Sequence, residues 1–175
     1  MTWKLDTAHS AVEFSVRHMM VSTVKGNFKE FSVDLDLNPQ DLANSSAKAV
    51  IQVASIDTRE PGRNGHLTSA DFFEVEKYPE ITYQSRNVKA LGGDRYQVEG
   101  DLTVKDVTRP VALEVAFLGV QTSPQGAKVA GFEASTKISR KDFGLNWNVA
   151  LETGGVLVGD EIKISLDIEA NEVAA

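Results

Sequence analysis

Apolar and polar residues alternate with a period of two along nearly the whole of this chain. Successive side chains of a β-strand point to opposite faces, so this alternation is typical of strands with one face against a core and the other in water. The pattern therefore predicts an all-β fold. The segments that show it are 12–17, 31–37, 49–53, 96–104, 111–117 and 162–169, with two weaker ones at 81–89 and 129–138.

Short loops that contain glycine join consecutive segments of this pattern, as at 91–94 and 123–126. Such loops are typical of antiparallel hairpins rather than of parallel crossovers. About eight strands with little helix between them favour a closed barrel or a sandwich, because closure removes the exposed edges of a long sheet. The alternation alone does not choose between these two architectures.

The alternation stops between residues 55 and 79, and the composition there predicts a short helical excursion around 60–75. A long connection in a compact domain is commonly a lid or a binding loop. This one carries the adjacent pair Phe72 and Phe73. The pair either belongs to such a lid or plugs one end of the barrel.

The size and charge of the chain exclude several classes of protein. With 175 residues, the chain is expected to fold as one domain over 1–175. Its 25 acidic and 18 basic residues give a net charge of -7, which disfavours binding to nucleic acid. It contains no cysteine, so disulfides and thiolate chemistry are excluded.

The N-terminal residues show neither the basic stretch nor the apolar run of a signal peptide. No segment reaches the roughly 18 uninterrupted apolar residues that a membrane-spanning helix needs. We therefore expect a cytoplasmic protein that does not insert into a membrane.

The candidates for acid–base or metal chemistry are His9, His18 and His66, and their spacing matches no metal motif. No nucleophile elbow of the Gly-x-Ser-x-Gly kind occurs in the chain. We therefore expect no cofactor, no metal and no catalytic residue. Residues 142–144, Asp-Phe-Gly, match a kinase tripeptide but lack the other kinase motifs.

A set of ordered motifs along nearly the full chain resembles the YceI-like family. The motifs are Trp3 with Asp6, His9-Ser10, 14–18, Gly26 with Phe28 and Phe31, 55–58, His66-Leu67, 71–73, Tyr78-Pro79, 100–103, Pro110-Val111, Arg140 with 142–144, and 158–161. The resemblance implies an eight-stranded antiparallel, extended lipocalin-like barrel whose lumen holds an isoprenoid or fatty chain. It also implies a homodimer, and many relatives are periplasmic, unlike the cytoplasmic location expected here.

An eight-stranded barrel is just wide enough to be filled by its own side chains or to enclose one slender ligand. The apolar faces either line such a tunnel or pack a solid core. The residues predicted to contact a ligand in the lumen are Val12, Phe14, Val16, Phe28, Ile51, Val53, Phe72, Phe73, Val98, Leu102, Leu113, Val115 and Ile164.

A charged head group would stay at the mouth of the barrel, because burying it without partners costs several kcal/mol. The residues predicted to form this rim are Arg17, His18, Arg63 and His66. Salt bridges are the alternative for Arg17 and for Arg140, whose expected partner is Asp142.

The leading hypothesis is a protein that binds a long-chain apolar lipid, such as a polyisoprenoid, for sequestration or transport. One alternative is an enzyme of isoprenoid or lipid metabolism that uses His18 or His66 in the same cavity. The other is a solid barrel that serves as a stress-related interaction module.

Overall fold

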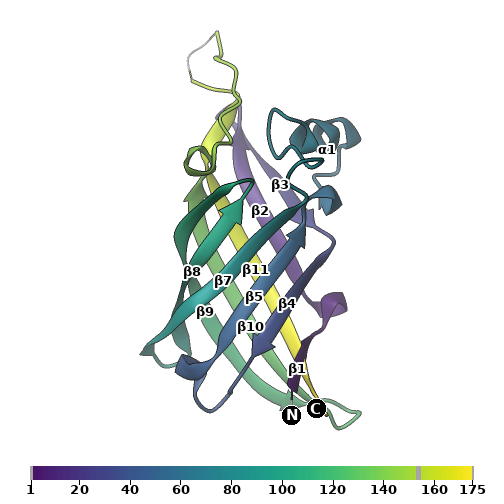
Figure 1. Ribbon diagram of the computed structural model, residues 1–175, viewed down its shortest axis with the longest axis vertical. Coiled ribbons are helices and arrows are strands. Elements are labelled where there is room, and N and C mark those ends of the chain that lie inside the picture. The colour runs from purple at the N-terminus through teal and green to yellow at the C-terminus, as the bar shows by residue number, and fades with distance from the viewer. Residues whose placement is uncertain (1, 153–154, 175) are drawn as a thin grey trace.

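The structure is a computed structural model that describes residues 2–152 and 155–174. It is an elongated antiparallel barrel with one short helix at its upper end (Figure 1). The strands of the described residues are β1 (Thr2–Leu5), β2 (Ala11–His18), β3 (Ser22–Phe28), β4 (Phe31–Asp36), β5 (Ser46–Gln52), β6 (Ile56–Asp57), β7 (Glu80–Gly92), β8 (Arg95–Val104), β9 (Val107–Thr122), β10 (Lys128–Ser139) and β11 (Val158–Val173). The helix is α1 (Pro61–Thr68), and single 3₁₀ turns lie at η1 (Thr7–His9), η2 (Leu42–Asn44), η3 (Val53–Ser55) and η4 (Arg140–Phe143).

Pairing between β1 and β11 closes the barrel. In the described residues the strand order is β1-β4-β5-β7-β8-β9-β10-β11, and β11 returns to β1 with Trp3 opposite Glu172. This ring confirms the predicted eight-stranded antiparallel barrel, and α1 confirms the predicted helical excursion.

The long strand β11 has two neighbours on the same side. Its C-terminal part pairs with β1, and its N-terminal part pairs with β2. The strands β2, β3 and β6 thus extend the sheet beyond the ring along the upper half of the barrel. The sequence pattern predicted β2 but missed β1, β3 and β6. The strands β1 and β6 are short, and β3 has Lys25, Gly26 and Asn27 between its apolar residues Val24 and Phe28.

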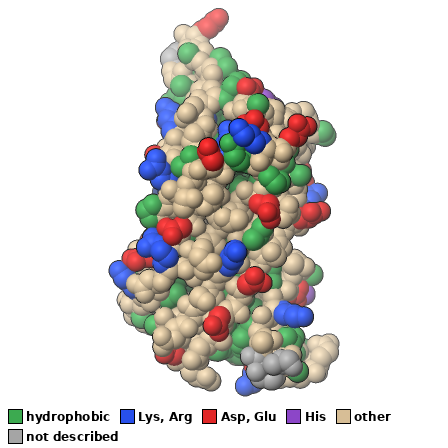
Figure 2. All heavy atoms as spheres, in the orientation of Figure 1, with side chains coloured by type: hydrophobic (Ala, Val, Ile, Leu, Met, Phe, Trp, Pro, Cys, Tyr) green, Lys and Arg blue, Asp and Glu red, His purple; other side chains and the backbone are tan. Residues whose placement is uncertain are grey.

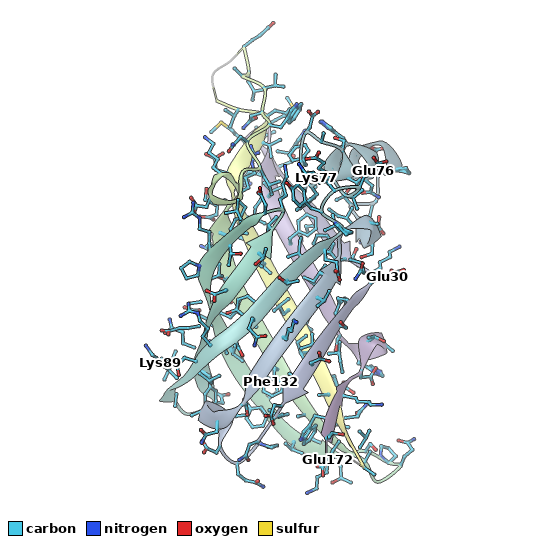
Figure 3. The ribbon with its side chains drawn as sticks, viewed as in Figure 1. Glu30, Glu76, Lys77, Lys89, Phe132 and Glu172 are labelled. Carbon is cyan, nitrogen blue, oxygen red and sulfur yellow. The ribbon has the colours of Figure 1, made fainter. Side chains whose placement is uncertain are left out.

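The two ends of the barrel differ in construction. The N and C termini lie together at the lower end of Figure 1, whereas α1 and the long connection after β10 lie at the upper end. The lower end is filled by Trp3, Ala130 and Ala170, with the rings of Phe117 and Phe132 stacked 5.1 Å apart. Phe132 is labelled near this end in Figure 3.

A second apolar cluster occupies the upper part of the barrel. Its buried members include Val12, Phe28, Ile56, Phe72 and Phe143, contributed by strands, by the excursion around α1 and by η4. The molecule therefore has a packed lower end and an upper end where connecting segments meet the barrel interior.

Candidate functional site: an apolar cavity in the upper barrel

A cavity of about 200 Å³ lies inside the upper half of the barrel. Cross-strand pairing explains why its walls are apolar, since inward residues of neighbouring strands stand opposite each other. The pairs between β2 and β11 are Val12 with Leu166, Phe14 with Ile164, and Val16 with Ile162. The cavity is thus built from the period-two alternation that dominates the sequence.

Two glycines make room for aromatic rings at the cavity wall. Phe14 lies over Gly26, where any added Cβ would come within 2.4 Å of the Phe14 ring. Tyr83 lies over Gly100 in the same way, with a closest approach of 2.5 Å. The glycines are required because a side chain at either position would overlap the ring.

The polar end of Tyr83 is satisfied by the barrel wall. Its hydroxyl donates to the carbonyl oxygen of Val111 at 2.8 Å and lies 3.4 Å from that of Val98. Burial raises the pKa of Tyr83 to about 12, so the phenol is neutral at physiological pH. The residue presents an apolar ring to the cavity while its one polar atom is hydrogen-bonded.

Ten of the thirteen residues predicted for the lumen line the cavity. They are Val12, Phe14, Val16, Phe28, Ile51, Phe72, Phe73, Leu102, Leu113 and Ile164. Their contact with a ligand stays a prediction.

Three predicted lumen residues lie outside the cavity lining. Val53 is buried, with 1% of its surface exposed, but it belongs to the 3₁₀ turn η3, where strand alternation has ended. Val98 and Val115 continue the inward faces of β8 and β9 past Gly100 and Leu113, beyond the Tyr83 ring. These three residues lie outside this cavity because alternation gives the face of a residue but not its height in the barrel, and their contact with a ligand stays a prediction.

Sequence reasoning also missed many lining residues. Those on strands, except Glu13, lie on the same inward face as the predicted ones, so alternation could have found them. Leu67 on α1 and the residues on η4 and its C-terminal flank follow no strand alternation. The missed lining residues are Glu13, Phe31, Val33, Ala49, Ile56, Leu67, Ile81, Tyr83, Val104, Val111, Thr136, Ile138, Arg140, Phe143, Leu145, Val158, Ile162, Leu166 and Ile168.

Aromatic residues of the excursion close the upper end of the cavity. Phe72 and Phe73 follow α1 and line the cavity, and Phe72 packs 5.4 Å from Trp147 of the connection after β10. The His66 ring stands edge-on to both Phe72 and Trp147, and its Nε2 lies 2.8 Å from the Asp71 carboxylate. The excursion and the connection after β10 together form a lid.

Arg140 fixes the connection after β10 to the barrel. Its guanidinium is 2% exposed and donates to four carbonyl oxygens, those of Leu145, Trp147, Val158 and Gly159, at 2.6–3.2 Å. Burial lowers the pKa of Arg140. The expected pairing with Asp142 was wrong, because the guanidinium turns inward to these carbonyls and the carboxylate of its ion pair is that of Asp160, 3.8 Å away.

The four residues predicted for a charged rim do not form one cluster. Arg17 is exposed on β2, between Val16, which lines the apolar cavity, and His18, which does not. His18 and Arg63 line a polar groove of about 810 Å³ between β3 and the segment 57–63, where Arg63 donates to Thr58. His66 belongs to the lid. Neither His18 nor His66 is among the residues that line the apolar cavity.

One group of metal-type ligands lies away from the cavity. The Nδ1 atom of His9 is 2.9 Å from the Asp6 carboxylate and 3.8 Å from that of Glu169. The hydrogen bond from His9 lowers the pKa of Asp6, and the same bond raises the pKa of His9. This mutual pairing accounts for the group, and sequence spacing missed it because Glu169 comes from the other end of the chain.

None of the described helices is long and apolar enough to span a bilayer. The fold and the cavity define the class of the protein as a lipocalin-like antiparallel barrel with an apolar interior.

Within that class the chain belongs to the YceI-like family, whose domain model matches residues 3–170, so the resemblance read from the sequence motifs is confirmed. The UPF0312 protein SERP2314 of Staphylococcus epidermidis is 40% identical over 168 residues, which are 95% of each chain. The UPF0312 protein SA2479 of Staphylococcus aureus is 38% identical over 165 residues, or 94% of each chain.

Solved structures share the fold. BcnA of Burkholderia cenocepacia superposes with a TM-score of 0.83 at 27% identity, covering 94% of this chain and 98% of its own. The YceI protein of Campylobacter jejuni gives a TM-score of 0.78 at 30% identity over 90% of both chains. A polyisoprenoid binding domain from Saccharophagus degradans gives 0.74 at 15% identity over 99% of both, which is a likeness of fold.

Proposed function

We propose that the protein binds a long-chain apolar lipid, such as a polyisoprenoid, in the barrel lumen for sequestration or transport, without transforming it. The observation that carries this proposal is the apolar cavity inside the closed upper barrel. Apolar surface of this kind favours hydrocarbon, because each methylene transferred out of water contributes about 0.8 kcal/mol. The ionisable side chains on its lining are those of Glu13, Tyr83 and Arg140.

The size of the cavity sets how a chain enters. An engineered cavity of about 150 Å³ holds one benzene molecule, so about 200 Å³ accepts a short piece of hydrocarbon with the side chains in their present positions. A longer chain has to displace the row of rings formed by Phe14, Phe28 and Phe73, whose centroids are 5.4 Å and 6.3 Å apart. These rings occupy the path that an extended ligand takes along the barrel.

The binding energy of a chain can support this displacement. An isoprene unit contributes on the order of 3 kcal/mol of transfer energy. Association costs about 4–15 kcal/mol in lost freedom, so several units exceed the cost. Affinity therefore rises with the number of units that enter the lumen.

Two further observations support this function over the alternatives. The solid barrel is disfavoured by the cavity, and the enzyme is disfavoured because His18 faces the polar groove and His66 the lid. The name of the Saccharophagus degradans relative records binding of a polyisoprenoid by that protein, in a barrel of the same fold.

A pair of adjacent substitutions tests the proposal. Ala49 lines the cavity on β5, whereas its neighbour Lys48 is exposed, so Ala49→Phe fills the lumen and Lys48→Phe adds the same side chain outside. We expect the wild type and Lys48→Phe to bind a fluorescent long-chain probe equally, and Ala49→Phe to bind it at least tenfold more weakly. Mass spectrometry of organic extracts from natively purified protein identifies the lipid.

The proposal fails if the folded wild type binds no long-chain probe and its extracts hold no lipid. It also fails if Ala49→Phe, folded by circular dichroism, binds the probe as tightly as Lys48→Phe. Turnover of labelled isoprenoid diphosphates that is lost in His18→Ala or His66→Ala would establish the enzyme instead.

A further inference from the structure

Exposed apolar side chains gather at one end of the molecule. Of the seven large hydrophobic residues that the described structure exposes, five lie at the upper end, namely Met19, Met20, Val21, Val149 and Val156. We call these five residues the apolar tip. Met20 is 62% exposed and Val21 is 80% exposed. Figure 2 shows hydrophobic side chains at this end with an acidic side chain at its top, and charges of both signs among hydrophobic side chains on the barrel wall below.

Two segments far apart in the sequence build the apolar tip. The turn between β2 and β3 carries Met19 to Val21, and the connection after β10 carries the two other valines. The Met19 amide donates to the Leu157 carbonyl oxygen at 2.8 Å, and the Met20 thioether lies against Gly155. These contacts hold the two segments side by side as one surface.

The backbone at the turn is strained. Met19 and Met20 have φ angles of +52° and +61°, and the Val21 amide closes the turn on His18 at 3.2 Å. A turn whose two central residues both have positive φ angles strongly prefers Asn-Gly, because larger side chains lose energy in the left-handed region. Strain of this kind persists where it serves a function. Here it places two flexible apolar side chains at the upper end of the barrel.

The apolar tip adjoins the cavity. Val16 lies three residues before Met19, Val158 lies two residues after Val156, and both line the cavity. A surface that docks on the tip therefore lies next to the lid, at the end where the lumen meets the connecting segments. The opposite end of the barrel carries the packed cluster around Trp3 and Ala170.

From these observations we infer that the apolar tip docks the protein on a lipid bilayer, with Met19, Met20 and Val21 inserted into the interface. The inference rests on the proposed function, since a bilayer is the store from which a long-chain lipid is drawn. Shallow insertion of an apolar surface is the mode of proteins that lie on a membrane without spanning it. Glu152 is exposed on the same connection and the net charge is -7, so the matching surface is an uncharged bilayer rather than an anionic one.

Flotation with phosphatidylcholine vesicles tests the inference. We expect the wild type to float with the vesicles and Met20→Asp/Val21→Asp to lose at least tenfold in partitioning. The matched control is Leu91→Asp/Leu118→Asp, which alters the two exposed leucines outside the tip and is expected to bind within twofold of the wild type. Lys89, two residues before Leu91 on β7, is labelled in Figure 3 and lies below the apolar tip.

A second variant separates docking from folding. Met19→Asn/Met20→Gly supplies the residues that the turn prefers, so we expect a higher melting temperature together with weaker vesicle binding. Lower stability in this variant would overturn the role given to strain. Failure of the wild type to bind neutral vesicles, a requirement for anionic lipid, or an equal loss in the leucine control would overturn bilayer docking.

The two proposals fail separately. Ala49→Phe is expected to lose probe binding and keep vesicle docking, whereas Met20→Asp/Val21→Asp is expected to keep binding of a soluble long-chain probe. If the wild type binds the probe but not vesicles, docking is wrong and the binding function stands. If it binds vesicles but not the probe, the lumen function is wrong.

Discussion

Removing the Arg140 guanidinium tests how the lid is held on the barrel. In Arg140→Met the side chain keeps much of its length and apolar stem but loses every donor. Four carbonyl oxygens lose a hydrogen bond, and one of them, that of Val158, keeps the Asn148 amide at 2.7 Å. The carbonyl oxygens of Leu145, Trp147 and Gly159 lose the donor that Arg140 gives them.

The expected cost follows from these three acceptors. A buried acceptor left without its donor costs about 1–3 kcal/mol. Three such groups give at least about 3 kcal/mol, and removal of a buried charge returns part of that sum. We therefore expect Arg140→Met to lower the free energy of unfolding by about 2–4 kcal/mol, a large share of the roughly 5–15 kcal/mol of a typical domain.

Urea denaturation followed by tryptophan fluorescence measures this loss, and hydrogen exchange locates it. We expect faster exchange in 145–149, the segment that Arg140 anchors. The matched control is Arg109→Met, because the exposed Arg109 makes one hydrogen bond, 3.3 Å long, to the Asp142 carbonyl oxygen. The control should change the free energy of unfolding by no more than about 0.5 kcal/mol. A loss below about 1 kcal/mol in Arg140→Met would refute the reasoning.

Three other substitutions test the packing and pairing described above. Gly26→Ala should lower the melting temperature and weaken binding of a long-chain probe, because the new methyl pushes the Phe14 ring into the cavity. Tyr83→Phe should cost about 1 kcal/mol in urea denaturation by removing the hydroxyl hydrogen bond to the barrel wall. The raised pKa of His9 means that its pairing with Asp6 stabilises the fold fully below the unfolded histidine pKa of about 6.5 and is lost as pH rises through the folded pKa. The difference in melting temperature between wild type and His9→Gln should therefore be larger at about pH 5.5 than at about pH 9.

Most of the fold could be predicted because the alternation of apolar and polar residues identifies most of its strands. Each of the eight segments with period-two alternation became a strand, and the break in alternation at 55–79 became the α1 excursion. The closing strand β1 was not predictable, because it has four residues and its place beside β11 depends on the other end of the chain. Strand closure is a long-range contact that local pattern does not encode.

The candidate site was predictable in chemistry and less so in position. The period-two alternation correctly placed Val12, Phe14 and Val16 on one face of their strand, the face that lines the cavity. The height at which the cavity ends was not predictable, since it depends on Tyr83 lying over Gly100 from the neighbouring strand. The excursion with Phe72, Phe73 and His66 was predicted as a lid or a plug, but the part played by Trp147 was missed because it comes from a connection whose conformation follows from tertiary contacts.

The construction of the two ends determines how a ligand reaches the lumen. At the lower end, Trp3 and the stacked pair of Phe117 and Phe132 pack between strands whose ladders fix them in place. At the upper end, the closing groups lie on connecting segments, which open at a lower free-energy cost than paired strands. Since Arg140 anchors one of these segments, we expect the hydrogen bonds that stabilise the fold also to slow its opening. A variant with a loosened anchor, such as Arg140→Met, should therefore release a bound long-chain probe faster than wild type.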